Sequence, residues 1–142
     1  MPNFSFEVRA HFTVIEGDSD WKNLLTRAGR LVADYEISEA ELNGFNERAG
    51  TRVSTLSASL VPLESRVVDA TRQIGEAEIT LDIVANLTAS DEIEAAGTGI
   101  DLLEFFNLDP YFLAGYNEKA GTRFTKFTRN DLAVATVSLA QE

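Results

Sequence analysis

The sequence predicts an α+β domain built from two copies of one unit, each with two strands and a helical segment between them. The string LNGFNERAGTR, Leu42 to Arg52, returns 71 residues later as LAGYNEKAGTR, Leu113 to Arg123, with eight of eleven positions identical. In addition, each copy opens with alternating apolar and polar residues. We therefore divide the 142-residue chain, a single domain, into two tandem repeats, 1–71 and 72–142.

The opening strand of each copy is predicted from this alternation. Apolar side chains occupy every second position from Phe4 to Val14 in the first copy and from Ile79 to Leu87 in the second. This period of two is typical of strands that are buried on one face. The positions between carry mainly polar side chains, His11 among them. One face of the sheet should therefore be polar and open to water or to a partner.

Two helices are expected in the first copy. Apolar residues at helical spacing run from Trp21 to Tyr35, after a capping sequence Asp-Ser-Asp at 18–20. A second helix should begin at Ser38, because a glutamate three residues later completes a capping box. Gly50 is well placed to end this helix.

The second copy is expected to depart from this pattern. Asp109, followed by proline, marks the start of its second helix. The sequence Gly-Thr-Gly at 97–99 should interrupt its first helix. After each AGTR string the chain should return as a strand, bent near Pro62 in the first copy and alternating at 133–139 in the second. A full break near Pro62 would give six shorter strands instead.

A strand, helical segment, strand unit that is used twice gives the order βαββαβ. This order resembles ferredoxin-like folds, whose own pseudo-twofold axis relates two βαβ halves. The resemblance implies an antiparallel sheet with the two alternating strands at its centre. It also implies that helices cover one face and leave the polar face uncovered.

Composition indicates a folded, acidic protein. The formal net charge is −11, and residues 73 to 118 hold ten acids and no Lys, Arg or His. There is no cysteine, which removes disulfide and thiolate chemistry. No apolar run approaches the roughly 20 residues of a membrane span, and the N-terminus lacks a signal-peptide pattern. We expect a soluble protein with no membrane contact, located in the cytoplasm or assembled into a particle.

The candidates for a polar site are few. The duplication would place Arg52 and Arg123 at pseudosymmetric positions. However, a helix that ends on glycine, with Glu and Arg around the turn, needs this sequence merely to fold, and we favour this structural interpretation. His11, the single histidine, could act as a base or metal ligand, although a surface histidine is the simpler interpretation. We name these three as a possible polar site and predict no catalytic residue, metal or cofactor.

The stretch from Glu47 to Leu60, ERAGTRVSTLSASL, resembles helix-turn-helix proteins, in which a small turn precedes a Ser/Thr-rich recognition helix. A net charge of −11 would repel phosphate, and Pro62 would cut such a helix. We therefore predict no nucleic-acid partner.

Aromatic side chains gather between Ile100 and Tyr116, and two short helices cannot hide all of them on one face. The segment is either a deeply buried corner of the core or, in part, an apolar contact patch for another protein. The possible contact residues are Phe105, Phe106, Tyr111, Phe112 and Tyr116.

We expect a non-enzymatic protein–protein interaction or assembly module. It should be a homo-oligomer that uses the open sheet face or the segment from Phe105 to Tyr116 for contact, as a structural component of a larger or viral particle would. One alternative is a small-molecule-binding or catalytic domain with a pocket between sheet and helices, using Arg9, His11 or the two arginines of the turns. Another is an acidic inhibitor that mimics nucleic acid through residues 73–118, the span without Lys, Arg or His.

Overall fold

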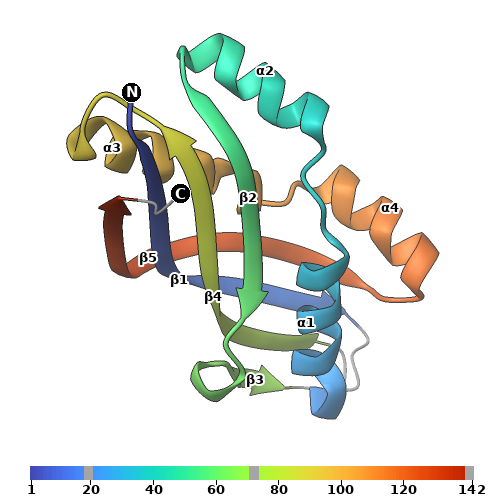
Figure 1. The fold of residues 1–142 in the computed structure, drawn as a ribbon. Helices are drawn as coiled ribbons and strands as arrows, with labels where there is room; N and C mark the ends of the chain where they lie inside the picture. Colours follow the sequence, from blue (N-terminus) through green and yellow to red (C-terminus); the bar gives the residue numbers. More distant parts are fainter. Residues whose placement is uncertain (18–20, 71–73, 140–142) are drawn as a thin grey trace.

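The computed structural model describes residues 1–17, 21–70 and 74–139, which form one antiparallel sheet and four helices (Figure 1). The strands are β1 (Asn3–Gly17), β2 (Arg52–Leu60), β3 (Arg66–Ala70), β4 (Ile74–Thr88) and β5 (Phe124–Leu139). The helices are α1 (Leu24–Asp34), α2 (Glu39–Ala49), α3 (Glu92–Leu102) and α4 (Pro110–Ala120). Short 3-10 turns are η1 (Trp21–Asn23), η2 (Pro62–Glu64) and η3 (Leu103–Phe106). The predicted α+β class is confirmed.

The strands lie in the order β2-β4-β1-β5, and β3 also pairs with β4, beyond the end of β2. All these pairings are antiparallel. The two strands predicted from alternation are therefore the central ones, as expected. The chain after the first AGTR string forms two strands separated by η2 at Pro62, whereas the chain after the second forms β5 alone. The described sheet accordingly has five strands, because only the first copy has this break.

The central strands pair along their whole length. The register runs from Asn3 opposite Thr88 to Gly17 opposite Ile74 without a bulge. Along β1, side chains at even-numbered positions are buried and those at odd-numbered positions are exposed or half-buried. The expected half-buried strand is therefore confirmed.

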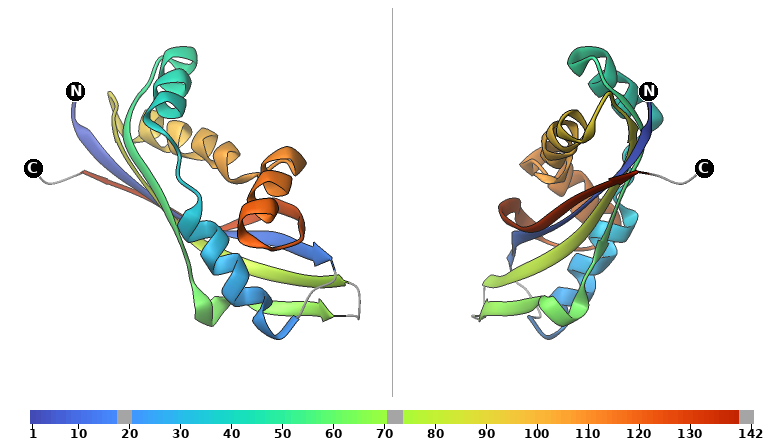
Figure 2. Two further views of the ribbon diagram at one scale, coloured as in Figure 1. Left: turned by 90° about the vertical axis from the view of Figure 1, so that its right-hand side faces the viewer. Right: turned by 60° about the vertical axis from the view of Figure 1, so that its left-hand side comes forward.

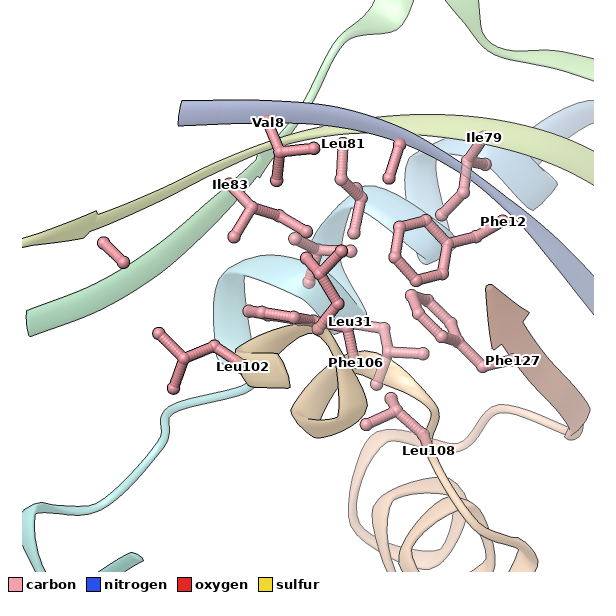
Figure 3. Close-up of a cluster of buried hydrophobic side chains, with 14 of the residues drawn as sticks. Val8, Phe12, Leu31, Ile79, Leu81, Ile83, Leu102, Phe106, Leu108 and Phe127 are labelled. Atoms are coloured by element: carbon pink, nitrogen blue, oxygen red, sulfur yellow. The ribbon is translucent and has the colours of Figure 1, made fainter. Parts of the chain in front are cut away.

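The core lies between the apolar face of the sheet and the helices. Figure 2 shows the helices on one side of the sheet and the other side uncovered. In Figure 3, side chains of the strands, such as Phe12 and Ile83, point toward Leu31 of α1 and Leu102 of α3. The ring of Phe12 also packs against Phe127 of β5, with ring centroids 5.4 Å apart. Segments from both copies thus share one core.

The expected helix ends are confirmed where the structure describes them. The Ser38 hydroxyl accepts the N–H of Glu41 and the Glu41 carboxylate accepts the N–H of Ser38, which is the capping box of α2. The helix ends at Gly50, whose φ of 67° is left-handed. Asp109 caps α4. The capping sequence expected at 18–20 lies outside the described residues.

The prediction that the Gly-Thr-Gly sequence interrupts a helix is wrong. α3 runs from Glu92 to Leu102 through both glycines. A Cβ atom at Gly99 would lie 2.4 Å from the ring of Phe6, so the glycine allows the helix to approach β1 closely. Gly99 therefore serves close packing of α3 against β1, although its low helix propensity predicts a break in the helix.

The helix-turn-helix resemblance is also overturned, because residues Arg52–Leu60 form strand β2 and not a helix. Pairing with β4 and the Ser/Thr-rich composition suit an edge strand. Among the described residues, no helix is long and apolar enough to cross a membrane.

Gly99→Ala should lower the free energy of unfolding by about 1 to 3 kcal/mol, because the new methyl group meets the buried Phe6 ring. A Cβ atom at Gly97 in the same helix would have nothing within 4 Å, so Gly97→Ala should instead raise stability by up to about 1 kcal/mol. Urea denaturation of both variants tests this. Equal effects of the two substitutions would contradict the close approach of α3 to β1.

Candidate functional site

The two repeated turns have the same hydrogen bonds. Asn46 Oδ1 accepts the hydroxyl of Thr51 and the N–H of Val53, both at 2.9 Å, and its Nδ2 donates to the Val53 carbonyl at 3.0 Å. Asn117 makes the corresponding three bonds in the second turn, at 2.8 to 2.9 Å. Each asparagine therefore joins the end of a helix to the first residues of the next strand.

The rest of the repeated string also serves this connection. Gly50 and Gly121 have φ values of 67° and 72°, in the left-handed region that glycine adopts without strain. Their N–H groups donate to the carbonyls of Asn46 and Asn117. The helix-to-strand turn accounts for these residues, which supports the structural interpretation of the repeat.

The two arginines of the repeat do not share a site. Arg52 begins β2 and Arg123 precedes β5, and these strands are the opposite edges of the sheet. The backbone N–H of Arg123 donates to Glu16, a buried carboxylate at the end of β1, at 3.1 Å. Arg27 of α1 donates to the same carboxylate at 2.8 Å. The ion pair between Arg27 and Glu16 thus links α1 to β1. The backbone N–H of Arg123 joins the turn before β5 to the same carboxylate.

Arg9 occupies the middle of the uncovered sheet face. It donates to both oxygens of Asp82, directly across on β4, at 2.8 and 3.1 Å, and to Glu64 of η2 at 2.8 Å. A shallow hollow of about 430 Å³ lies beside it. The guanidinium already has two carboxylate partners and Glu7 also lines the hollow, so no positive charge is left there for an anionic ligand.

His11 also lies on this face, away from the helices. The Thr80 hydroxyl donates to the Glu64 carbonyl at 2.8 Å, so it must accept from His11 Nδ1–H at 3.0 Å. This pattern assigns the proton to Nδ1. Neither His11 nor Arg9 can line a pocket between sheet and helices, since both are on the opposite face. Their bonds instead hold η2 against the sheet.

The aromatic segment of the second copy divides between core and surface. Phe106 is buried, and Phe105 and Tyr116 are partly buried against the core. Phe112 is 37% exposed and Tyr111 is 91% exposed. The segment is therefore partly core and partly exposed surface, and a contact role for the exposed part stays a prediction.

Tyr35, at the end of α1, joins this segment to the first copy. Its hydroxyl donates to the carbonyl of Phe105 at 2.6 Å. Its ring packs edge-on against Phe106 and Phe112, with centroids 6.0 and 5.1 Å apart. Sequence reasoning placed Tyr35 on a helix face but missed this role, which depends on how the two copies pack.

A groove of about 620 Å³ lies between α1 and α4. Its lining includes two residues of α1 and four larger residues of α4: Arg30, Asp34, Tyr111, Phe112, Tyr116 and Lys119. Gly115 also lines it, and a Cβ atom there would meet nothing within 4 Å. The groove is therefore aromatic on the α4 side, and its lining carries two positive charges, from Arg30 and Lys119, and the negative charge of Asp34.

A hydrogen bond across the groove fixes one of its aromatic rings. The Tyr116 hydroxyl donates to Asp34 Oδ2 at 3.0 Å. Partial burial, followed by this bond and the charge of Asp34, raises the pKa of Tyr116 to about 12. Burial, with weaker contributions from Glu41 and Asp109, likewise raises the pKa of Tyr35 to about 12.

Other chemistry has little support in the described part of the chain. No group of three or more His, Asp or Glu side chains there is arranged to hold a metal ion. The acidic residues between 73 and 118, the span without Lys, Arg or His, are also spread out. Glu76, Glu78 and Asp82 lie on β4, whereas others lie on α3, η3 and α4. Since the strand and helix layers both carry them, they do not form one acidic face.

No protein-family model matches the sequence, and no curated protein matches it. The function is therefore inferred from the residues of the chain itself.

Asn117→Ala should lower the free energy of unfolding by about 2 to 4 kcal/mol, because three hydrogen bonds of about 1 kcal/mol each are lost. Asn43→Ala is the matched control, since Asn43 is exposed and the second copy has alanine, Ala114, at the equivalent position. It should change stability by less than about 0.5 kcal/mol. An Asn117→Ala protein of unchanged stability would contradict the structural interpretation of the repeat.

The free energy of unfolding should fall as the pH rises from 10 toward 12. A tyrosine whose pKa is raised from 10.0 in the unfolded chain to about 12 in the fold stabilises the protein below pH 10, and this contribution is lost on ionisation. The measurement is the absorbance of tyrosine phenolate as a function of pH. Tyr116→Phe and Tyr35→Phe should each remove part of the absorbance increase near pH 12. If Tyr116→Phe removes only an ionisation near pH 10, the bond to Asp34 is not formed in solution.

Proposed function

We propose that the chain is a non-enzymatic interaction and assembly module that self-associates through the groove between α1 and α4. The observation that carries this proposal is Tyr111, whose side chain is 91% exposed at the edge of a groove of about 620 Å³. Tyrosine is enriched at protein–protein contacts because its large ring buries apolar area while its hydroxyl finds a partner.

α4 has a second apolar side that its own chain leaves uncovered. Leu113 is the one buried residue among the eleven of this helix. The ring of Tyr111 is nevertheless 91% exposed, and that of Phe112, which packs against Tyr35 on one side, is 37% exposed. An exposed aromatic surface on a helix is stabilised when a partner removes it from water, at roughly 25 cal/mol per Å².

The same surface contains both a protruding ring and a groove that could receive one. A twofold contact brings identical surfaces together, so Tyr111 of each copy would enter the groove of the other. Gly115 leaves the room that this arrangement needs, because no side chain fills the groove there. A second copy of the chain is therefore the partner that we favour.

Charge also suits a second copy. The groove is lined by Arg30, Lys119 and Asp34, so its lining has one net positive charge in a chain whose net charge is −11. Asp109 lies two residues before Tyr111 and would follow that ring toward the partner's groove. Opposite charges would then meet at the margin of the contact, where they favour specificity and association rate more than affinity.

We also infer that the two halves are copies of one unit in a ferredoxin-like arrangement. In the β1–β4 pairing Ala10 lies opposite Leu81, which is its own equivalent at the repeat offset of 71. A pseudo-twofold axis through this pair would relate the halves. The order β2-β4-β1-β5, with β3 taken as the continuation of β2, supports the same arrangement.

Gly115→Leu should weaken self-association at least tenfold, because the new side chain fills the groove. Tyr111→Ala should do the same, since loss of a central aromatic anchor costs about 2 kcal/mol or more. The Tyr111 side chain is exposed, and a Cβ atom at position 115 would meet nothing within 4 Å. The fold should therefore persist in both variants. Native mass spectrometry and light scattering over a range of concentrations provide the measurement.

Gly44→Leu is the matched control. Gly44 holds the position in α2 that Gly115 holds in α4, so helix propensity changes equally, but Gly44 does not line the groove. This variant should associate like the unmodified chain. A strict monomer at tens of micromolar before any substitution, or equal weakening by Gly44→Leu and Gly115→Leu, would overturn the proposal.

A further inference from the structure

We propose that the outer edge of β5, from Leu132 to Leu139, is a second self-association surface that pairs antiparallel with the same strand of another copy. β5 is the last strand of the sheet on its side, so its outer edge has no neighbouring strand among the described residues. The surface goes beyond the groove between α1 and α4 because it involves other residues. In Figure 1 the end of β5 lies at the left and α4 at the right.

The outer edge of β5 before Leu132 is covered by another segment of the same chain. The N–H of Leu108 donates to the carbonyl of Phe127 at 3.0 Å. The N–H of Arg129 donates to Asn107 Oδ1 at 2.6 Å. The connection between η3 and α4 therefore satisfies edge groups that would otherwise be open to another strand.

The second half of the edge lacks such cover in the described structure. Residues 132–139 pair with β1 on their inner side, and no other backbone hydrogen bond joins them to a described residue. Their sequence, LAVATVSL, contains no charge, proline or glycine and includes the β-branched residues that favour strands. Exposed edges of this composition readily accept a further strand.

The opposite edge of the sheet carries the features that prevent such pairing. Pro62 and the 3-10 turn η2 divide it into β2 and β3. Register irregularities follow Val53 and Val67, and Arg66 adds a charge. Proteins protect edge strands by these same means. β5 has an irregularity of its own between Leu132 and Val134, and its register with β1 is regular from Val134 to Leu139. The regular run of β2, residues 55–60, is bounded by a register shift and by the break at Pro62 and has one β-branched residue, whereas residues 134–139 of β5 have three. The contrast therefore favours residues 134–139 as the edge segment that accepts a further strand.

The sequence of the segment favours a second copy as its partner. Ala135, Val137 and Leu139 pair with apolar-face residues of β1, whereas Thr136 and Ser138 pair with residues of its polar face. A twofold axis perpendicular to the sheet would place apolar side chains beside apolar ones and hydroxyls beside hydroxyls. Since these residues are uncharged in a chain of net charge −11, like charges do not meet within the paired strands.

Two surfaces on different sides of the molecule allow assembly beyond a dimer. If the groove joins one pair of copies and β5 joins each copy to a further one, the array continues. Growth of this kind is what a structural component of a larger particle requires.

The test is a pair of lysines on the open edge, Thr136→Lys with Ser138→Lys. Both side chains are exposed on the uncovered sheet face, so the fold should be kept, whereas four lysines would be brought together in a twofold strand pair. We expect assemblies larger than a dimer to disappear. The control is Ser57→Lys with Ser59→Lys, which makes the same change at exposed positions of β2 and should leave assembly unaltered.

A Tyr111→Ala background separates this inference from the proposed function. With the groove contact removed, the β5 edge should still give a dimer, and adding the two β5 lysines should give a monomer. A monomer with Tyr111→Ala alone would overturn the β5 contact and leave the groove proposal standing. An unmodified chain that forms only a dimer, which Tyr111→Ala leaves unchanged and the β5 lysines convert to a monomer, would overturn the groove proposal and leave the β5 contact standing.

Amide hydrogen exchange tests the same contact without any substitution. The outward N–H groups of residues 132–139 should exchange at least tenfold more slowly at high protein concentration than at low concentration. Those of β2 should not change with concentration. Exchange at 132–139 that is independent of concentration would overturn the inference.

Discussion

The pairing of β1 with β4 is the constraint on which the rest of the structure depends. Both strands have fifteen residues, and every residue of one faces a residue of the other. A slip of one residue would turn Phe6 and Phe12 from the core to the open face, so burial fixes the register strongly. The helices then cover the apolar face of this pair. α1 and α2 connect β1 to the edge strand β2, and α3 and α4 connect β4 to the edge strand β5.

Irregularity is displaced to the edge strands as a result. β2 and β5 both have register shifts, whereas the central pair has none. At η2, the break near Pro62 is closed by polar contacts: Val61 N–H donates to the Thr80 carbonyl at 2.8 Å, and Arg9 holds the Glu64 carboxylate. The two edges therefore differ: β2 ends at the break near Pro62, whereas β5 continues as one strand to Leu139.

The features that the sequence predicted correctly are local ones. Alternation defined β1 and β4, and capping residues defined the starts of α2 and α4, because these signals involve neighbours along the chain. The failures involve packing between distant segments. Gly99 is a helix residue because the Phe6 ring lies against it. The groove was not predictable for the same reason: α1 and α4 come from different copies, and only the fold places Tyr116 against Asp34.

The two halves of the chain differ at the start of their second helices, α2 and α4. At the repeat offset, Phe112 corresponds to Glu41, which completes the capping box of α2. In α4 the cap comes from Asp109 alone, followed by a proline that needs no N–H partner. The Asp109 carboxylate accepts the N–H of Phe112 without a return bond from the third helical position, which carries an aromatic ring instead of the glutamate of α2. An aromatic ring at this position of α4 is thus compatible with a capped helix start, while Asn46 and Asn117 make the same connection to the sheet in both turns.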